Sequence, residues 1–120
     1  MLTFIREVIF YLTPNGGSPV KSFLASLTSK QRKKIAWALK LVKETPIVSR
    51  QYFKKLIGTD DIWEVRVDFG NDTFRILGFM DKGNLVILTN AFAKKTEKTP
   101  PNEIKIAEQR KKDYESQKNG

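Results

Sequence analysis

Hydrophobic and polar residues alternate along several short segments, and this pattern predicts β-strands. The alternation is clearest over Ile62–Phe69, where Trp63, Val65, Val67 and Phe69 would share one face. Three further runs are rich in apolar, β-branched and aromatic residues, namely Phe4–Leu12, Thr73–Met80 and Leu85–Phe92. Short Gly/Asn/Asp segments separate the last three strands, which predicts an antiparallel meander.

Apolar residues spaced by three or four positions predict helices in the rest of the chain. Ser18-Pro19 has the N-cap and first-turn residues of a short helix, and a capping box at Thr28 and Gln31 begins a second helix over Ser29–Glu44. A last helix is expected over Asn102–Gln117, and residues 45–61 are expected to form a connector. We therefore predict one α+β domain spanning residues 1–120, with the order β-α-α-β-β-β-α. An αα-hairpin would cover one face of an antiparallel sheet and leave the other face open.

Charged residues gather on the expected open face. Glu64, Arg66 and Asp68 alternate with the apolar residues of their strand, and Arg75 follows on the next strand. If Phe69 pairs with Phe74, the two arginines become diagonal neighbours. Paired guanidinium groups match phosphate oxygens and would form a phosphate cradle. The alternative is a set of surface ion pairs that contributes little to the stability of the fold.

The amino-acid composition limits which partners, metals and cofactors the protein is expected to bind. The 120-residue chain contains no Cys and no His, and its net charge of +9 lies entirely in residues 1–59. A basic protein suits a polyanionic or acidic partner. We expect no metal and no cofactor, because the usual metal ligands and the nucleotide-binding motifs are missing. No apolar stretch is long enough to span a bilayer and Met1–Leu12 lacks signal-peptide features, so we expect a cytoplasmic protein without a membrane partner.

Two motifs carry a resemblance to a known family. The stretch "IWEVRVDFGNDTFRILGF" contains W-E-x-R at Trp63–Arg66, and "FAKKTEKTP" occupies Phe92–Pro100. With "SPVKSFLASL" and "YFKKL" before them, they make the chain resemble the phage-related branch of the RelE/HigB toxins, within the RelE/ParE superfamily. The resemblance implies a RelE-like fold and the toxin of a type II toxin–antitoxin system. Such a toxin is a ribosome-dependent, metal-independent mRNA endonuclease that acts through 2′-hydroxyl attack and arrests translation.

The resemblance also implies partners and site residues. The partners would be a cognate helix-turn-helix antitoxin and the ribosome with mRNA in its A site. Residues that match the family pattern receive roles in catalysis, orientation or RNA binding: Arg66, Arg75, Lys94 and Lys95 are catalytic, Glu64 orients Arg66, and Lys54, Lys55, Phe92, Thr96 and Lys98 bind RNA. Many relatives carry His or a similar residue shortly before the Phe, where this chain has Thr89-Asn90-Ala91. Two alternatives stay open, a ParE-like inhibitor of DNA gyrase and a non-catalytic module that binds RNA or DNA.

Overall fold

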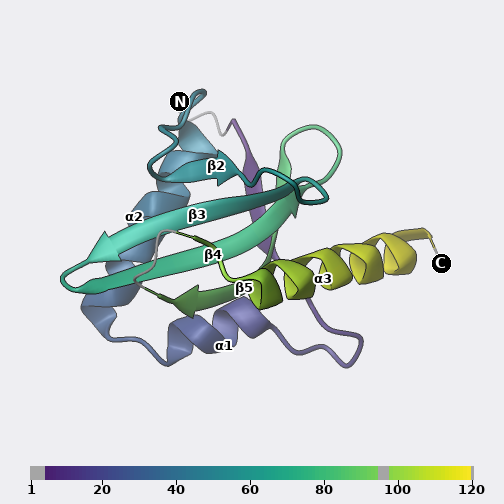
Figure 1. Ribbon diagram of the computed structural model, residues 1–120, viewed down its shortest axis with the longest axis horizontal. Helices are drawn as coiled ribbons and strands as arrows, with labels where there is room; N and C mark the ends of the chain where they lie inside the picture. The colour runs from purple at the N-terminus through teal and green to yellow at the C-terminus, as the bar shows by residue number, and fades with distance from the viewer. Residues whose placement is uncertain (1–4, 95–97, 120) are drawn as a thin grey trace.

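The computed structural model describes residues 5–94 and 98–119. The secondary-structure elements follow in the order β1 (Glu7–Phe10), α1 (Pro19–Ala25), α2 (Ser29–Glu44), β2 (Phe53–Lys55), β3 (Ile62–Phe69), β4 (Asp72–Met80), β5 (Leu85–Ala93) and α3 (Pro101–Asn119). The α+β class is confirmed. Figure 1 shows α3 in front of the sheet, with α1 and α2 behind it.

The helix starts follow from the local sequence. Ser18 caps α1 by accepting a hydrogen bond from the backbone N–H of Lys21, and Pro19 occupies the first turn. At α2, the Gln31 N–H donates to Thr28 Oγ1 (3.2 Å) and the Thr28 N–H donates to Gln31 Oε1 (2.9 Å). This is the predicted capping box, and the predicted bounds of α2 are also confirmed.

The hairpin of α1 and α2 packs on one face of the sheet. Its buried residues, which include Val20, Ile35 and Val42, meet the apolar residues of β3 and β4. Burying each such side chain stabilises the fold by about 1.5–3 kcal/mol. The alternation in β3 therefore assigns the correct residues to this face.

The sheet has the strand order β1-β5-β4-β3-β2 and is mixed, which corrects the expected antiparallel sheet. β1 runs parallel to β5, while the other neighbours are antiparallel. Parallel pairing needs a long crossover, which the helices and the meander between β1 and β5 provide. The segment 45–61 also contains β2, a short edge strand where only a connector was expected.

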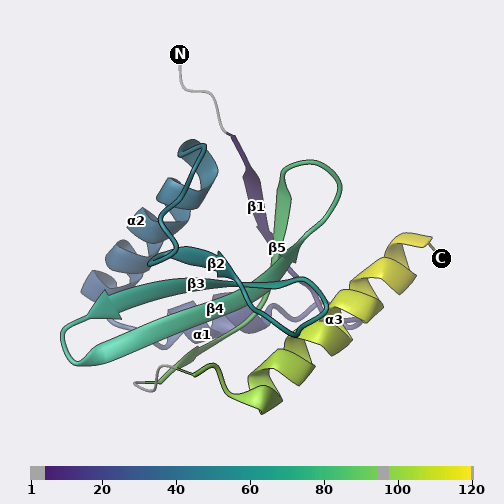
Figure 2. The ribbon, with the colours of Figure 1, turned by 45° about the horizontal axis from the view of Figure 1, so that its top comes forward.

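The second face of the sheet is not fully open, because α3 covers part of it. Ala107 is fully buried there among Ile62, Leu77 and Phe79. Figure 2 shows α2 and α3 on opposite sides of the sheet. Much of the attachment of α3 is polar: Tyr11 donates to Asp113, Tyr114 donates to Asp81 (2.8 Å), and Lys118 pairs with Asp81 (2.8 Å).

Within the described part of the chain, every helix is too short or too polar to cross a bilayer.

Candidate functional site

Arg66 on β3 lies directly opposite Arg75 on β4. The expected pairing of Phe69 with Phe74 is wrong, because Phe69 pairs with Asp72 across a two-residue turn. Gly70 in that turn has φ 59°, which is the backbone that a type II′ hairpin requires at its first central position. The shift is two residues, so each side chain keeps its predicted face and the arginines become direct neighbours.

The backbone pattern brings these two arginines close together. The Arg66 N–H donates to the Tyr52 carbonyl (2.9 Å), so its hydrogen-bonding groups point toward the β2 side. Arg66 and Arg75 therefore form a non-hydrogen-bonded pair, the type with Cα atoms about 4.5 Å apart. Phe92 on β5 lies opposite Arg75. We call these three residues the arginine row.

The neighbouring rows of the same face carry further polar residues. On the side toward α3, the pairing places Lys54, Glu64, Leu77 and Asn90 side by side on successive strands. On the side away from α3, Asp68 pairs with Thr73, and the Lys94 N–H donates to the Thr73 carbonyl (2.9 Å). The arginine row thus lies between a buried row and a more exposed one, and its Phe92 packs against the cluster that includes Ala107 of α3.

Burial differs sharply between the two arginines. The Arg66 side chain is 19% exposed, whereas Arg75 is only 1% exposed. Glu64 is fully buried, with Oε1 3.6 Å from Arg66 Nε and Oε2 accepting a hydrogen bond from Thr99 Oγ1 (2.6 Å). A ligand from solvent therefore reaches Arg66 first, and neighbouring atoms must move before it touches Arg75.

The predicted RNA-binding lysines do not all lie on this face. Lys54 pairs with Glu64 in the sheet and shares its face. Lys55 pairs with Trp63, so it lies on the opposite face, where its ammonium group contacts Asp61 (2.6 Å). This hydrogen bond from Lys55 lowers the pKa of the Asp61 carboxyl group.

The other predicted lysines follow β5. Lys94 and Lys98 are exposed. Lys95 and Thr96 lie outside the described residues, so their roles stay predictions. Four of the predicted residues, Glu64, Arg66, Arg75 and Phe92, are brought together by strand pairing, with Lys54 and Lys94 in the flanking rows.

Asn90, in the segment where the resemblance led us to expect a proton carrier, makes structural contacts. Its side chain is 4% exposed, accepts from Thr89 Oγ1 (2.6 Å), and donates to Glu103 Oε1 (3.0 Å) and to the Glu103 carbonyl (3.2 Å). These bonds tie β5 to the start of α3. Residue spacing did not reveal this role, nor the contact of Thr99 with Glu64, because both join segments that are distant along the chain.

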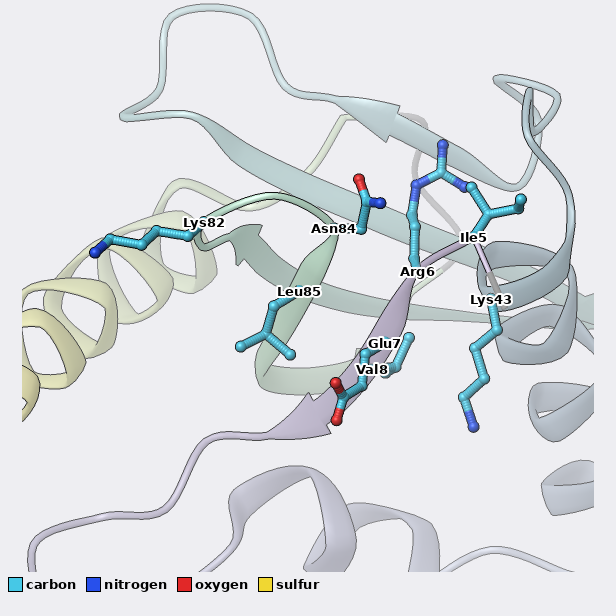
Figure 3. Close-up of a pocket in the computed structure, with 8 residues that line it drawn as sticks. All are labelled: Ile5, Arg6, Glu7, Val8, Lys43, Lys82, Asn84 and Leu85. Carbon is cyan, nitrogen blue, oxygen red and sulfur yellow. The ribbon is translucent and has the colours of Figure 1, made fainter. Parts of the chain in front are cut away.

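A depression at the start of β1 contains none of the predicted site residues. Its lining includes Arg6, Lys43 and Lys82, and Figure 3 shows the Lys82 side chain extending to the left and the Lys43 side chain extending downward. The Arg6 guanidinium group donates to the carbonyls of Val42, Thr45 and Pro46 at the end of α2 (2.9–3.0 Å). Arg6 thus caps a helix terminus. Among residues 5–94 and 98–119, no three acidic side chains gather as a metal site would require.

Comparison with known proteins supplies the family. Residues 22–112 match the model of a family described as "Phage derived protein Gp49-like". The chain belongs to this family. The Gp49-like proteins are RelE/HigB-type toxins, so the family expected from the two motifs is confirmed.

A solved structure is also similar. A chain in the crystal structure of the archaeal RelE–RelB complex from Pyrococcus horikoshii OT3 is 16% identical, with a TM-score of 0.47. The match covers 72% of the present chain and 92% of the archaeal one. No curated protein matches the sequence.

Proposed function

We propose that this Gp49-like protein is the toxin of a type II toxin–antitoxin system and cleaves mRNA on the ribosome. The observation that carries the proposal is the direct pairing of Arg66 with Arg75, with Phe92 in the same row. Two guanidinium groups on rigid strands suit a phosphodiester, and an aromatic ring beside them suits a base. Exposed Lys94 adds positive charge at the edge.

The reaction that suits these groups uses the RNA as its own nucleophile. The 2′-oxygen forms a bond to the adjacent phosphorus, the bond from phosphorus to the 5′-oxygen breaks, and a cyclic phosphate remains. Arg66 and Arg75 stabilise the charge that develops on the phosphate oxygens. The Lys94 ammonium group supplies the proton that the leaving 5′-oxygen takes up, and the 2′-hydroxyl proton passes to solvent water, because the arginine row contains no basic group that could accept it.

Glu64 and Asn90 are poor candidates for a general base. Glu64 is fully buried in the row next to the arginine row, and the Asn90 amide is not basic and already bonds Glu103. With no His in the chain, the usual proton carrier is missing as well. These observations favour a second candidate function, a module that binds RNA at the arginine row without cutting it.

One experiment separates the two functions. The purified protein is mixed with ribosomes that carry an end-labelled mRNA, and the RNA products are mapped. We expect cuts in the A-site codon that leave a 2′,3′-cyclic phosphate, and no cut when the scissile nucleotide is 2′-deoxy. Salt-dependent binding without any cut would reject the nuclease and support the binding module. Normal translation together with gyrase-dependent DNA damage in expressing cells would instead indicate a ParE-like inhibitor.

The proposed partner in the resting state is a cognate antitoxin. Residues 1–59 carry eleven Lys or Arg residues and only Glu7 and Glu44 as acids. Such a surface favours an acidic partner. Co-expression with the protein encoded by the adjacent reading frame should restore growth and yield a complex, and helix-turn-helix residues in that protein would agree with the expected antitoxin type.

A further inference from the structure

Thr99 reaches the site from a distant part of the chain. It stands between exposed Lys98 and Pro100, just before α3, and is itself 7% exposed. Its hydroxyl group donates to Glu64 Oε2 over 2.6 Å, although 35 residues separate the two. Through Glu64, this contact connects Thr99 to Arg66 of the arginine row.

Glu64 connects Thr99 to Arg66. It precedes Arg66 by two residues on β3, so both side chains lie on the same face. One carboxylate oxygen binds Thr99, while the other lies 3.6 Å from Arg66 Nε. A buried carboxylate is held by the donors around it, and bonds to charged groups are among the strongest in proteins. Fixing Oε2 therefore fixes the direction in which Oε1 faces Arg66.

We propose that Thr99 is a positioning residue, which orients Arg66 through Glu64. The proposal deepens the proposed function and rests on it for its catalytic consequence. Thr99 fixes the Glu64 carboxylate, and the carboxylate holds the guanidinium plane of Arg66 toward the phosphate. Loss of the hydroxyl group therefore lowers the rate of the chemical step more than the affinity for the programmed ribosome.

Independent contacts hold the segment around Thr99 in place. Asn90 bonds Glu103 at the start of α3, and Ala107 is fully buried one turn later. A Thr99→Val substitution keeps the shape of the side chain and removes the hydroxyl group. The variant therefore tests the hydrogen bond itself rather than the docking of α3.

The chain provides a matched control. Thr73 Oγ1 donates to Asp68 Oδ1 (2.8 Å), which is also a contact between a threonine and a carboxylate, but it is exposed. The experiment compares wild type, Thr99→Val, Thr99→Ser and Thr73→Val. It measures the ¹⁵Nε–H signal of Arg66 by NMR, assigned by its loss in Arg66→Lys, and the kcat and KM of cleavage on programmed ribosomes.

We expect Thr99→Val to move the Arg66 Nε signal and to lower kcat about tenfold or more, with KM little changed. Thr99→Ser should restore both, and Thr73→Val should change neither. An unmoved Arg66 signal in folded Thr99→Val, or a Thr99→Ser as impaired as Thr99→Val, would overturn the proposal. If Thr99→Val does not fold, Thr99→Ala takes its place, because it adds no apolar bulk beside the carboxylate. A wild type that cuts no RNA, but whose Arg66 signal responds to Thr99→Val, would support the positioning contact and reject the proposed nuclease.

Discussion

Arg66 and Arg75 face each other across β3 and β4 in a non-hydrogen-bonded pair, with the buried carboxylate of Glu64 next to Arg66. Because neighbouring strands fix their backbones, the separation of the two guanidinium groups depends on side-chain torsions alone. This relationship distinguishes the arginine row from the exposed basic residues elsewhere on the surface.

The arginine pair predicts a loss of activity when the guanidinium fork is replaced while the charge is kept. Arg66→Lys should lower the single-turnover rate of cleavage about 100-fold, because an ammonium group cannot bind two phosphate oxygens in the same plane. Arg75→Lys should also lower this rate. Arg50→Lys, an exposed site in the connector before β2, is the control and should retain wild-type rates. Full activity in both row variants, measured on folded protein, would reject the pair as the catalytic element.

We expect substitution of Asn90 to lower the stability of the fold, because its side chain joins β5 to α3. Asn90→Ala should lower the free energy of unfolding by about 2 kcal/mol, since buried bonds to Glu103 and Thr89 are lost. Asn90→Asp should cost more, because it places a second carboxylate against Glu103 Oε1. Adding Glu103→Gln to Asn90→Asp should recover part of the loss, which urea unfolding of the full double-mutant cycle would measure. Equal stability of Asn90→Ala and wild type would contradict the role of Asn90 in joining β5 to α3.

We expect that any side chain at Gly78, where β4 and β5 form a bulge, would destabilise the pairing of these strands. The strand register shifts between Leu77 and Gly78, and a Cβ atom at Gly78 would lie 2.3 Å from the Ile87 carbonyl oxygen. Gly78→Ala should therefore lower the free energy of unfolding by about 3 kcal/mol. Gly17→Ala, in an exposed loop where the new Cβ atom would lie 3.1 Å from Thr13 Oγ1, should change it by less than about 1 kcal/mol. Similar unfolding midpoints for the two variants would show that the strands separate more easily than the backbone contact implies.

Because Asp81 forms an ion pair with Lys118 of α3, we expect acid to weaken the attachment of α3 to the sheet. The hydrogen bond from Lys118 lowers the pKa of Asp81 to about 2, from an ordinary value of 3.8. A lowered folded-state pKa contributes stability that is fully present above the unfolded value and is lost as pH falls through the folded one. Asp81→Asn should therefore cost about 1 kcal/mol at pH 7, reduced by the partial exposure of both partners.

The difference between Asp81→Asn and wild type should shrink below pH 4 and vanish only below pH 2. Urea unfolding at several pH values, with the exposed Asp72→Asn as control, measures this dependence. A difference that stays constant from pH 7 to pH 2 would show that the ion pair with Lys118 contributes nothing.

The sequence by itself determined the local elements and the faces of the strands. The capping box at Thr28, the start of α1 after Ser18, and the bounds of α2 and β3 depend on contacts between near neighbours, which spacing reveals. The alternation in β3 assigns Arg66 to the polar face because successive side chains in a strand point in opposite directions. The two motifs also indicated the family.

Only the tertiary structure decided which residues meet. The parallel pairing of β1 with β5, the cover that α3 provides, and the bonds of Thr99 with Glu64 and Asn90 with Glu103 all join residues far apart in the chain. The register of β3 and β4 depended on the turn geometry at Gly70, and a change of two residues preserves every face while replacing every partner. Periodicity specifies the direction in which a side chain points. The residue opposite that side chain on the next strand is set by the balance of packing and hydrogen bonding over the whole fold. That balance placed Arg75 opposite Arg66.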